Sequence, residues 1–442
     1  MIRTVMPPLT LTKKRFTLAI VGLVAFFVFI ALFGESTTVT YDRDLAAKEI
    51  ASASASSSME YATGTASSTG DTISPMTTAT GSIPTLSAQS ITSNGTSTPK
   101  AHPPVVHQKT PAVVRAAYMT SCIASGAGLR APMLKLLDTT SLNAIVIDVK
   151  DYTGYISIDF NNPEFPIGGK SCLVKDMHEF LAELGAKGIY RIARIAVMQD
   201  PHYADAHPDQ AVKRKDNGGI WRDKKGLAFV DPSSKDFWKY IRDVATAAYA
   251  AGFDEVNFDY VRFPTDGDLS NMSFAHNAST TKAMVMKDFF AYIGGAMKEK
   301  HIPSSVDIFG MVTTAKDDLG IGQYLENIMP YFDYVAPMVY PSHYPPGFNG
   351  WKDPNMYPGP LTEFVMGEAV KRAKAQGYGP EKFRTWIQDF NYGKIYTVTD
   401  VRAEIENSAK VGVTSYMAWD PSNRYTSAAY VQSANPVSVA NQ

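Results

Sequence analysis

The feature that most constrains this chain is an alternation of short apolar runs with longer amphipathic runs between residues 115 and 435. Short apolar runs bounded by turn residues are typical of buried strands, and apolar residues three and four apart are typical of helices. Eight strand and helix units alternate, and no Gly-rich phosphate loop opens any of the helices. The pattern therefore predicts an α/β protein, a (β/α)8 TIM barrel rather than an open doubly wound sheet.

The predicted elements can be placed by residue number. Strands are predicted at 116–120, 143–151, 189–198, 254–263, 304–314, 333–341, 383–390 and 413–420. Helices are predicted at 133–138, 173–188, 233–252, 281–300, 321–332, 361–377 and 400–412. Residues 199–230 form a polar insertion, and the helix that follows it opens with a Ser cap and ends on Gly.

The N-terminus carries a candidate membrane segment. Residues 16–33 form an uncharged apolar run, which would measure roughly 27 Å as a helix and can span a bilayer. Residues 1–15 are basic and are expected to stay in the cytoplasm, with the rest of the chain outside. Because the run ends in Leu32 and Phe33, a poor cleavage site, we expect an uncleaved single-pass signal anchor. If the segment is cleaved, the protein is secreted.

Amino-acid composition separates the rest of the chain into a polar linker, a folded domain and a short tail. From residue 51 to residue 100, 24 of 50 residues are Ser or Thr, which is too polar a composition to order a core. We therefore expect a disordered Ser/Thr/Pro-rich linker at 36–114, a barrel domain at 115–430 and a C-terminal tail at 431–442. The chain has 42 Lys and Arg against 43 Asp and Glu, and this balance argues against a nucleic-acid partner.

The chain has two cysteines, Cys122 and Cys172. A disulfide between them would close a loop of about 50 residues and contribute roughly 4 kcal/mol under the chain-entropy model. Two unpaired buried thiols are the alternative. Neither cysteine has the neighbours of a nucleophile or a zinc site.

In a TIM barrel the active site lies at the C-terminal ends of the strands. Side chains two apart in a strand share a face, so Asn257 and Asp259 should point into the barrel together, while Phe258 and Tyr260 point away. The same rule places Asp148 and Lys150 on one face. An inward Asp close to a basic residue would be either a structural ion pair or a tuned catalytic group.

Other polar residues near strand ends have competing interpretations. Asp231, Asp389 and Asp420 are each interpreted first as a helix cap or loop anchor. Three tryptophans are candidate sugar platforms, although core packing is the ordinary role of each: Trp221, Trp351 and Trp419. His202 and His207, with aspartates nearby, form a weak metal-site hypothesis, because their spacing matches no tight ligand pattern.

Five motifs resemble successive signatures of one family: GLAFVDPSSKDFW, GFDEVNFDYVRFP, VDIFG, VAPMVYPSHY and WIQDF. The family consists of glycoside-hydrolase-like TIM-barrel domains first catalogued as a domain of unknown function. The resemblance covers about residues 115–430, and it implies a barrel and the hydrolysis of a polysaccharide or other glycan.

The similarity to barrel glycosidases implies that Asp259 serves as nucleophile or base. Those enzymes often place an acid Glu on the fifth strand, but residues 304–314 contain none. The candidate acids are therefore Asp307, Asp389 and Asp148, in that order, although Asp307 lies early in its predicted strand, which would place it deep. We expect no metal ion or cofactor. The expected substrate-binding residues are Asn257, Tyr260, Arg262, Lys150, Arg194, Tyr340, Gln388, Trp419 and Asp420.

Two other functions stay open at this point. The absent Glu favours a non-catalytic barrel that binds carbohydrate or associates with the cell wall, because a fold does not by itself imply a function. A metal-dependent polysaccharide deacetylase is a more distant alternative.

Overall fold

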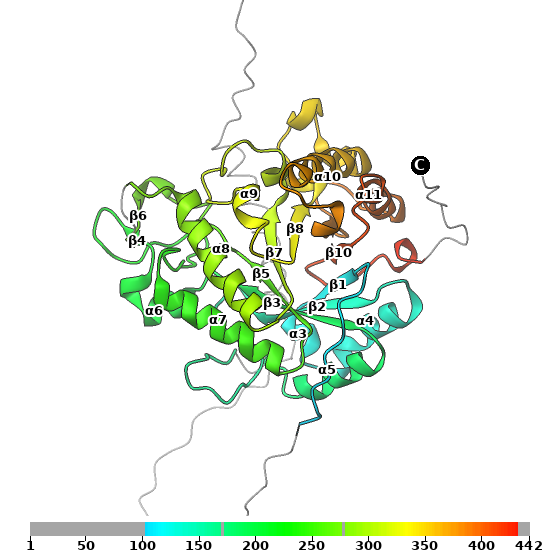
Figure 1. The fold of residues 1–442 in the computed structure, drawn as a ribbon, viewed down its shortest axis with the longest axis horizontal. Helices are drawn as coiled ribbons and strands as arrows, with labels where there is room; N and C mark the ends of the chain where they lie inside the picture. Colours follow the sequence, from blue (N-terminus) through cyan, green and yellow to red (C-terminus); the bar gives the residue numbers. More distant parts are fainter. Residues whose placement is uncertain (1–101, 169–171, 276–278, 432–442) are drawn as a thin grey trace, which may run out of the picture. The chain divides into compact units, whose positions relative to one another are not determined.

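The computed structural model describes residues 102–168, 172–275 and 279–431 (Figure 1). Eight parallel strands close into a barrel in the order β1-β10-β9-β8-β7-β5-β3-β2, and helices surround it. The predicted (β/α)8 TIM barrel is confirmed. The strands are β1 (Arg115–Met119), β2 (Ala144–Lys150), β3 (Tyr190–Ala196), β5 (Glu255–Asp259), β7 (Ser304–Phe309), β8 (Tyr334–Val339), β9 (Thr385–Gln388) and β10 (Tyr416–Trp419).

The helices outside the barrel largely follow the predicted amphipathic runs. They are α3 (Ser121–Ala124), α4 (Ala127–Thr139), α5 (Met177–Ala186), α7 (Lys235–Ala250), α8 (Lys282–Glu299), α9 (Leu325–Ile328), α10 (Pro358–Ala375) and α11 (Val398–Lys410). The predicted Ser cap of α7 is confirmed, because the Ser234 side chain accepts a hydrogen bond from the Phe237 N–H group. Phe237, Ile241 and Val244 are buried at helical spacing, so this face of α7 packs inward.

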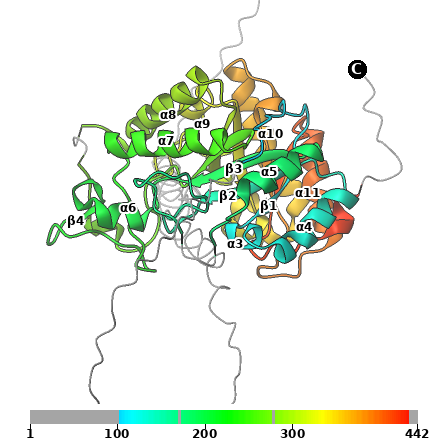
Figure 2. The same ribbon diagram turned by 90° about the horizontal axis from the view of Figure 1, so that it is seen from below.

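The polar insertion forms a small substructure beside the barrel. It contains α6 (Pro201–Ala206) and β4 (Lys213–Arg214), which pairs antiparallel with β6 (Met272–Ser273). In both views, α6 and β4 lie on the opposite side of the barrel from α4 and α11 (Figure 2). This insertion follows β3, so it extends the loops at the end of the barrel where the strands terminate.

Several predicted elements are shorter than expected, and two of them bear on the site. The helix predicted at 321–332 is reduced to Leu325–Ile328, because Gly320 and Gly322 have φ values of 67° and 84°, outside the helical region. The strand predicted at 304–314 ends at Phe309 and continues as a 3₁₀ turn from Gly310. Asp307 therefore lies near the end of its strand, and the expected deep position is wrong.

Cys122 and Cys172 form a disulfide, with their Cα atoms 4.3 Å apart. It joins α3 to the loop before α5. Of the two alternatives for these cysteines, the disulfide is therefore the one observed.

The segment before β1 is attached to the barrel. The Gln108 N–H group donates to Asp254 at 2.7 Å, and the His107 ring stacks on Tyr249 with centroids 3.8 Å apart. In the described part of the chain, no helix is long and apolar enough to cross a membrane. The predicted cytoplasmic segment, the predicted anchor at 16–33, residues 36–101 of the predicted linker and residues 432–442 of the predicted tail lie outside the described residues.

Candidate active site

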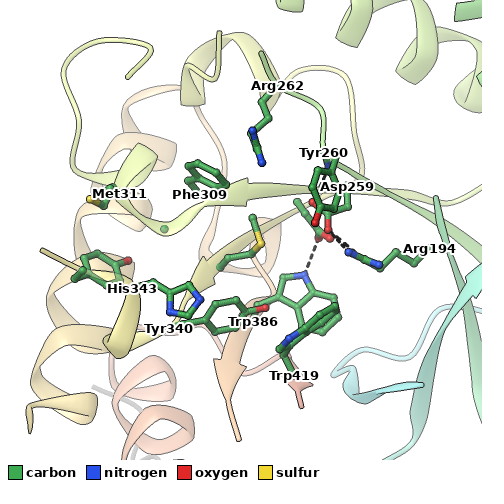
Figure 3. A pocket seen from close by; sticks show the side chains of 14 residues that line it. Arg194, Asp259, Tyr260, Arg262, Phe309, Met311, Tyr340, His343, Trp386 and Trp419 are labelled. Carbon is green, nitrogen blue, oxygen red and sulfur yellow. Dashed lines mark hydrogen bonds and ion pairs between the residues drawn. The ribbon is translucent and has the colours of Figure 1, made fainter. Parts of the chain in front are cut away.

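A pocket opens where the barrel strands end (Figure 3). Its walls come from six of the eight strands and from the loops that follow them, so residues far apart in the sequence meet there. The lining residues are Arg194, Asp259, Tyr260, Arg262, Asp307, Phe309, Gly310, Met311, Met338, Tyr340, His343, Tyr344, Trp386 and Trp419.

Asp259, the last residue of β5, is held in a buried ion pair with Arg194. The Nε and Nη2 groups of Arg194 both donate to Oδ2 of Asp259, the former at 3.2 Å. Nη1 of the same guanidinium donates to Oδ1 of Asp148 at 2.6 Å, and the Tyr118 hydroxyl donates to Oδ2 of Asp148. Asp148 does not line the pocket, so its role is to fix the position of Arg194.

The two carboxylates keep Arg194 charged. Burial alone lowers the pKa of Arg194, but the charges of Asp148 and Asp259 outweigh burial and raise this pKa well above its usual value. Burial raises the pKa of Asp148, against the opposing effect of Arg194 and the Tyr118 hydrogen bond. Arg194 therefore supplies the positive charge that compensates Asp259 inside the barrel.

Asp307 is the second carboxyl group of the pocket. Its Oδ1 atom accepts hydrogen bonds from Trp386 Nε1 at 2.7 Å and from Asn257 Nδ2 at 2.9 Å. Among the described residues, no donor is bonded to its Oδ2 atom. Burial, and then the charge of Asp259, raise the pKa of Asp307 well above its usual value. A carboxyl group in this setting keeps its proton to a higher pH than an exposed aspartate does.

The strand register explains why these two groups are neighbours. β5 and β7 are paired and parallel, and Phe258 lies opposite Val306. Asp259 and Asp307 are the next residues on their strands. Adjacent strands are about 4.8 Å apart, so the two carboxyl groups meet inside the barrel.

Side chains alternate in direction along β5 as far as Asp259, so Asn257 and Asp259 point the same way, but the alternation ends at Tyr260. Tyr260 has a φ of 53°, a left-handed conformation that is uncommon for a non-glycine residue. Its N–H group donates to Oδ1 of Asp259 at 2.6 Å, and its side chain lines the pocket. The expectation that Tyr260 points away from the pocket is therefore wrong, because the backbone turns before it.

Lys150 does not join the site. The pairing of β2 with β3 shifts register between Asp148 and Lys150, so Asp148 lies opposite Arg194 whereas Lys150 lies opposite Ile195. Lys150 Nζ instead lies 2.8 Å from Oδ2 of Asp200, and both side chains are fully buried. The expectation that Asp148 and Lys150 share a face is wrong because this irregularity breaks the two-residue period.

The Lys150–Asp200 pair should support stability rather than catalysis. We expect Lys150→Met to lower the free energy of unfolding by about 3–5 kcal/mol, because it leaves the carboxylate of Asp200 buried without a cation to balance its charge. Urea denaturation measures the change. The matched control is Lys187→Met, which removes an exposed pair with Asp138 and should change stability by at most about 1 kcal/mol. Equal effects of the two substitutions would contradict the assignment.

Three aspartates anchor loops, as their first interpretation predicted. Asp389 accepts hydrogen bonds from the Thr426 N–H and hydroxyl groups and from the Tyr430 hydroxyl, and burial raises its pKa to about 6. Asp420 accepts from the N–H and hydroxyl groups of Ser422.

Asp231 likewise accepts from the N–H and hydroxyl groups of Ser233, and from the N–H group of Ala275. The candidate acids were a different set, Asp307, Asp389 and Asp148, and of these Asp307 alone lines the pocket.

Gln388 does not line the pocket itself, but its side chain is hydrogen-bonded to the loop after β8, which does. Its Oε1 atom accepts from the Ser342 hydroxyl at 2.8 Å, and that hydroxyl lies 2.8 Å from Nδ1 of His343. Burial lowers the pKa of His343 to about 4, so its ring is neutral at pH 7. His343 lines the pocket, whereas Gln388 lies behind it.

Aromatic side chains form one wall of the pocket. Trp419 stacks on Tyr118 with ring centroids 4.0 Å apart, and the guanidinium of Arg194 lies 4.9 Å from the Trp419 centroid. Tyr340 and Trp386 are also part of this wall. Of the three tryptophans considered as sugar platforms, Trp419 lines the pocket, whereas Trp221 and Trp351 do not.

Sequence reasoning missed Trp386, Phe309 and His343 as pocket residues. Trp386 is two residues before Gln388 and shares its face, so the alternation rule could have found it. Phe309 stands two residues after Asp307 and could have been found in the same way. His343 lies in a loop and gave no periodic signal.

The weak metal hypothesis finds no geometric support. His202 packs on Tyr155, and His207 stacks on Tyr203. Within residues 102–168, 172–275 and 279–431, no group of three or more His, Cys, Asp or Glu side chains is arranged to hold a metal ion.

The comparisons with known proteins bear on the fold and on the family. Curated protein sequences give no match. The glycoside hydrolase domain of PgaB (BpsB) from Bordetella bronchiseptica has a similar fold, with a TM-score of 0.51 and 14% identity over 70% of this chain and 95% of that one. A hypothetical protein from Ruminiclostridium thermocellum ATCC 27405 is 30% identical over 46% of this chain and 98% of that one, with a TM-score of 0.39.

The sequence model of one family matches most of the barrel, from residue 116 to residue 425. The matched segment begins in β1 and includes all eight strands and every residue that lines the pocket. On this match, the chain belongs to the family described as "Putative glycosyl hydrolase domain".

Proposed function

We propose that this barrel hydrolyses glycosidic bonds in a cell-surface or extracellular polysaccharide, with Asp259 as the ionised carboxylate and Asp307 as the general acid. One observation carries the proposal: two neighbouring carboxyl groups share a pocket but have different surroundings. Asp259 is paired with a cation, whereas Asp307 is buried and meets only neutral donors. Glycoside hydrolysis needs such a pair, with one group ionised and one protonated.

The proposed roles follow from these contacts. Asp307 donates its proton to the glycosidic oxygen as the bond breaks, so the departing sugar leaves as a neutral alcohol. Asp259 acts on the opposite face of the ring, either by attacking the anomeric carbon or by removing a proton from the attacking water. Arg194 and the Tyr260 N–H group hold Asp259 in position. The face of Trp419 offers a platform for a sugar ring.

A hydrolysis screen tests the proposal. The full-length protein is incubated with cell-wall and exopolysaccharide glycans, and new reducing ends are measured. The anomeric form of the first product separates the two roles open to Asp259, since retention indicates a nucleophile and inversion a base.

Other outcomes of the screen would favour other functions. Glycan binding without new reducing ends, unchanged in Asp259→Asn, would indicate a non-catalytic binding barrel. Release of acetate that a chelator abolishes would indicate a deacetylase.

We also propose that the barrel works outside the cytoplasm, held by residues 16–33. The apolar run and its basic flank support this placement, and so does the disulfide, because disulfides persist in oxidising compartments. Protease added to intact cells should release a large fragment while the N-terminus stays with the membrane. A mature N-terminus near Ser36 would instead show that the segment is cleaved.

A further inference from the structure

Arg262 has an unusual position among the buried arginines. Its side chain lines the pocket and is 4% exposed. The guanidinium carbon lies 4.9 Å from the centroid of the Phe309 ring and 5.3 Å from that of Tyr260 (Figure 3). Nη1 donates to the Phe263 carbonyl oxygen at 3.1 Å and to the Thr265 hydroxyl at 3.2 Å. These bonds fix one edge of the guanidinium to its own loop.

The positive charge of Arg262 is not matched by a direct partner. The other buried arginines of the described chain each form an ion pair with a carboxylate: Arg130 with Asp176, Arg191 with Asp254, Arg194 with Asp148 and Asp259, and Arg384 with Glu255. Among the described residues, Arg262 has no such pair, and its Nε and Nη2 groups have no hydrogen-bond acceptor.

The direction of the pKa shift of Arg262 agrees with the absence of an ion pair at its side chain among the described residues. Burial lowers the pKa of Arg262, and the more distant groups of Tyr260, Asp259, Asp266 and Asp223 oppose this effect. A guanidinium nevertheless stays protonated in a protein, so a desolvated cation faces the pocket. Burying a charge without a partner is unfavourable, and an anionic ligand would relieve the cost.

The free edge of Arg262 indicates which anion would fit. Nε–H and Nη2–H point in parallel from a planar group and match the two coplanar oxygens of a carboxylate. In a glycan, such a carboxylate occurs as the C5 substituent of a uronic acid, and also in ulosonic acids, lactyl ethers and pyruvate ketals. We propose that Arg262 binds the carboxylate of a uronic acid residue, and that the substrate is an acidic polysaccharide. The identification of a substrate rests on the proposed function; the carboxylate site itself does not.

A binding experiment tests Arg262 independently of bond cleavage. The probes are oligogalacturonate and oligoglucuronate, each compared with its carboxyl-reduced, neutral form by calorimetry on the full-length protein. We expect at least one acidic probe to bind the wild type about 10- to 100-fold more tightly than its reduced form, the range of a charge-assisted bidentate contact. Arg262→Met should abolish this preference, and Arg262→Lys should keep part of it because the charge remains while the fork is lost.

The matched control is Arg222→Met, which removes an exposed arginine paired with Asp205 outside the pocket. This variant should keep the preference. Arg262→Met also removes the hydrogen bonds to the Phe263 carbonyl and the Thr265 hydroxyl, so the role of Arg262 is judged by the binding preference and not by the melting temperature.

Two outcomes would overturn the proposal. They are wild-type protein that binds the acidic and reduced forms equally, and a preference that survives in Arg262→Met. If Arg262→Met fails to fold, the comparison of acidic and reduced probes on the wild type still tests whether the pocket prefers a carboxylate, and Arg262→Lys tests the role of Arg262. An Arg262-dependent preference for the acid form without new reducing ends would support the carboxylate site and count against the hydrolase. Cleavage of neutral glycans alone, unaffected by Arg262→Met, would support the hydrolase and count against the carboxylate site.

Discussion

We expect Asp259→Asn to lower kcat by at least about 100-fold, the low end of what a positioned proton-transfer group contributes. Asn keeps the shape of the side chain and can still accept the hydrogen bond from the Tyr260 N–H group, but it cannot act as a base or a nucleophile. Arg194 keeps its second partner, Asp148. The loss of stability should therefore be smaller than the roughly 3–5 kcal/mol expected when a buried charge is left unpaired.

Steady-state kinetics and urea denaturation of the same preparations measure both effects. The control is Asp389→Asn, the same substitution at a buried carboxyl group that holds a loop outside the pocket, and its kcat should stay close to that of the wild type. In Asp259→Ala, added formate should restore part of the rate by supplying a carboxylate. Near wild-type hydrolysis by Asp259→Asn would falsify the assignment. A variant that fails to fold would indicate a structural ion pair instead.

The second large effect is expected at Asp307. Asp307→Asn should lower kcat by at least about 100-fold on a glycan, because the departing sugar needs a proton. On a nitrophenyl glycoside the loss should be much smaller, since nitrophenolate leaves without protonation. Asn can still accept the hydrogen bonds from Trp386 and Asn257, so folding should be little affected.

The pH profile gives an independent measure of the same role. A general acid is active while protonated, so the wild-type rate should fall as the pH rises through the pKa of Asp307. Burial and the charge of Asp259 raise that pKa well above its usual value, which extends activity toward neutral pH. In Asp307→Asn this alkaline decline should disappear. An equal loss on both leaving groups, with the alkaline decline intact, would exclude Asp307 as the acid.

Much of the fold could be read from the sequence because hydrophobic periodicity is a local property. Eight strands lie where short apolar runs predicted them, and the Ser cap of α7 lies where its sequence pattern placed it. Alternation also placed Asn257 and Asp259 on the inner face of β5. Where a glycine leaves the helical region, as at Gly322, the periodic pattern predicted a helix from residue 321, but the helix begins only at Leu325.

Which residues meet in the site was harder to predict from the sequence, because it depends on the register between neighbouring strands. A register shift in β2 sends Lys150 to Asp200 and leaves Asp148 facing Arg194. The sequence contains no trace of this shift, and the left-handed turn at Tyr260 is equally hidden.

By itself, the sequence determined the barrel and the inward direction of Asp259, since each depends on spacing along a single segment. Only the tertiary structure decided that Asp307 is its partner, that Arg194 balances its charge and that Arg262 forms no ion pair with a carboxylate of the described residues. These three facts depend on which strands pair, in which register, and how far each side chain reaches across the barrel. Burial then sets the charge state of each group, and burial is a property of the whole fold rather than of a local segment.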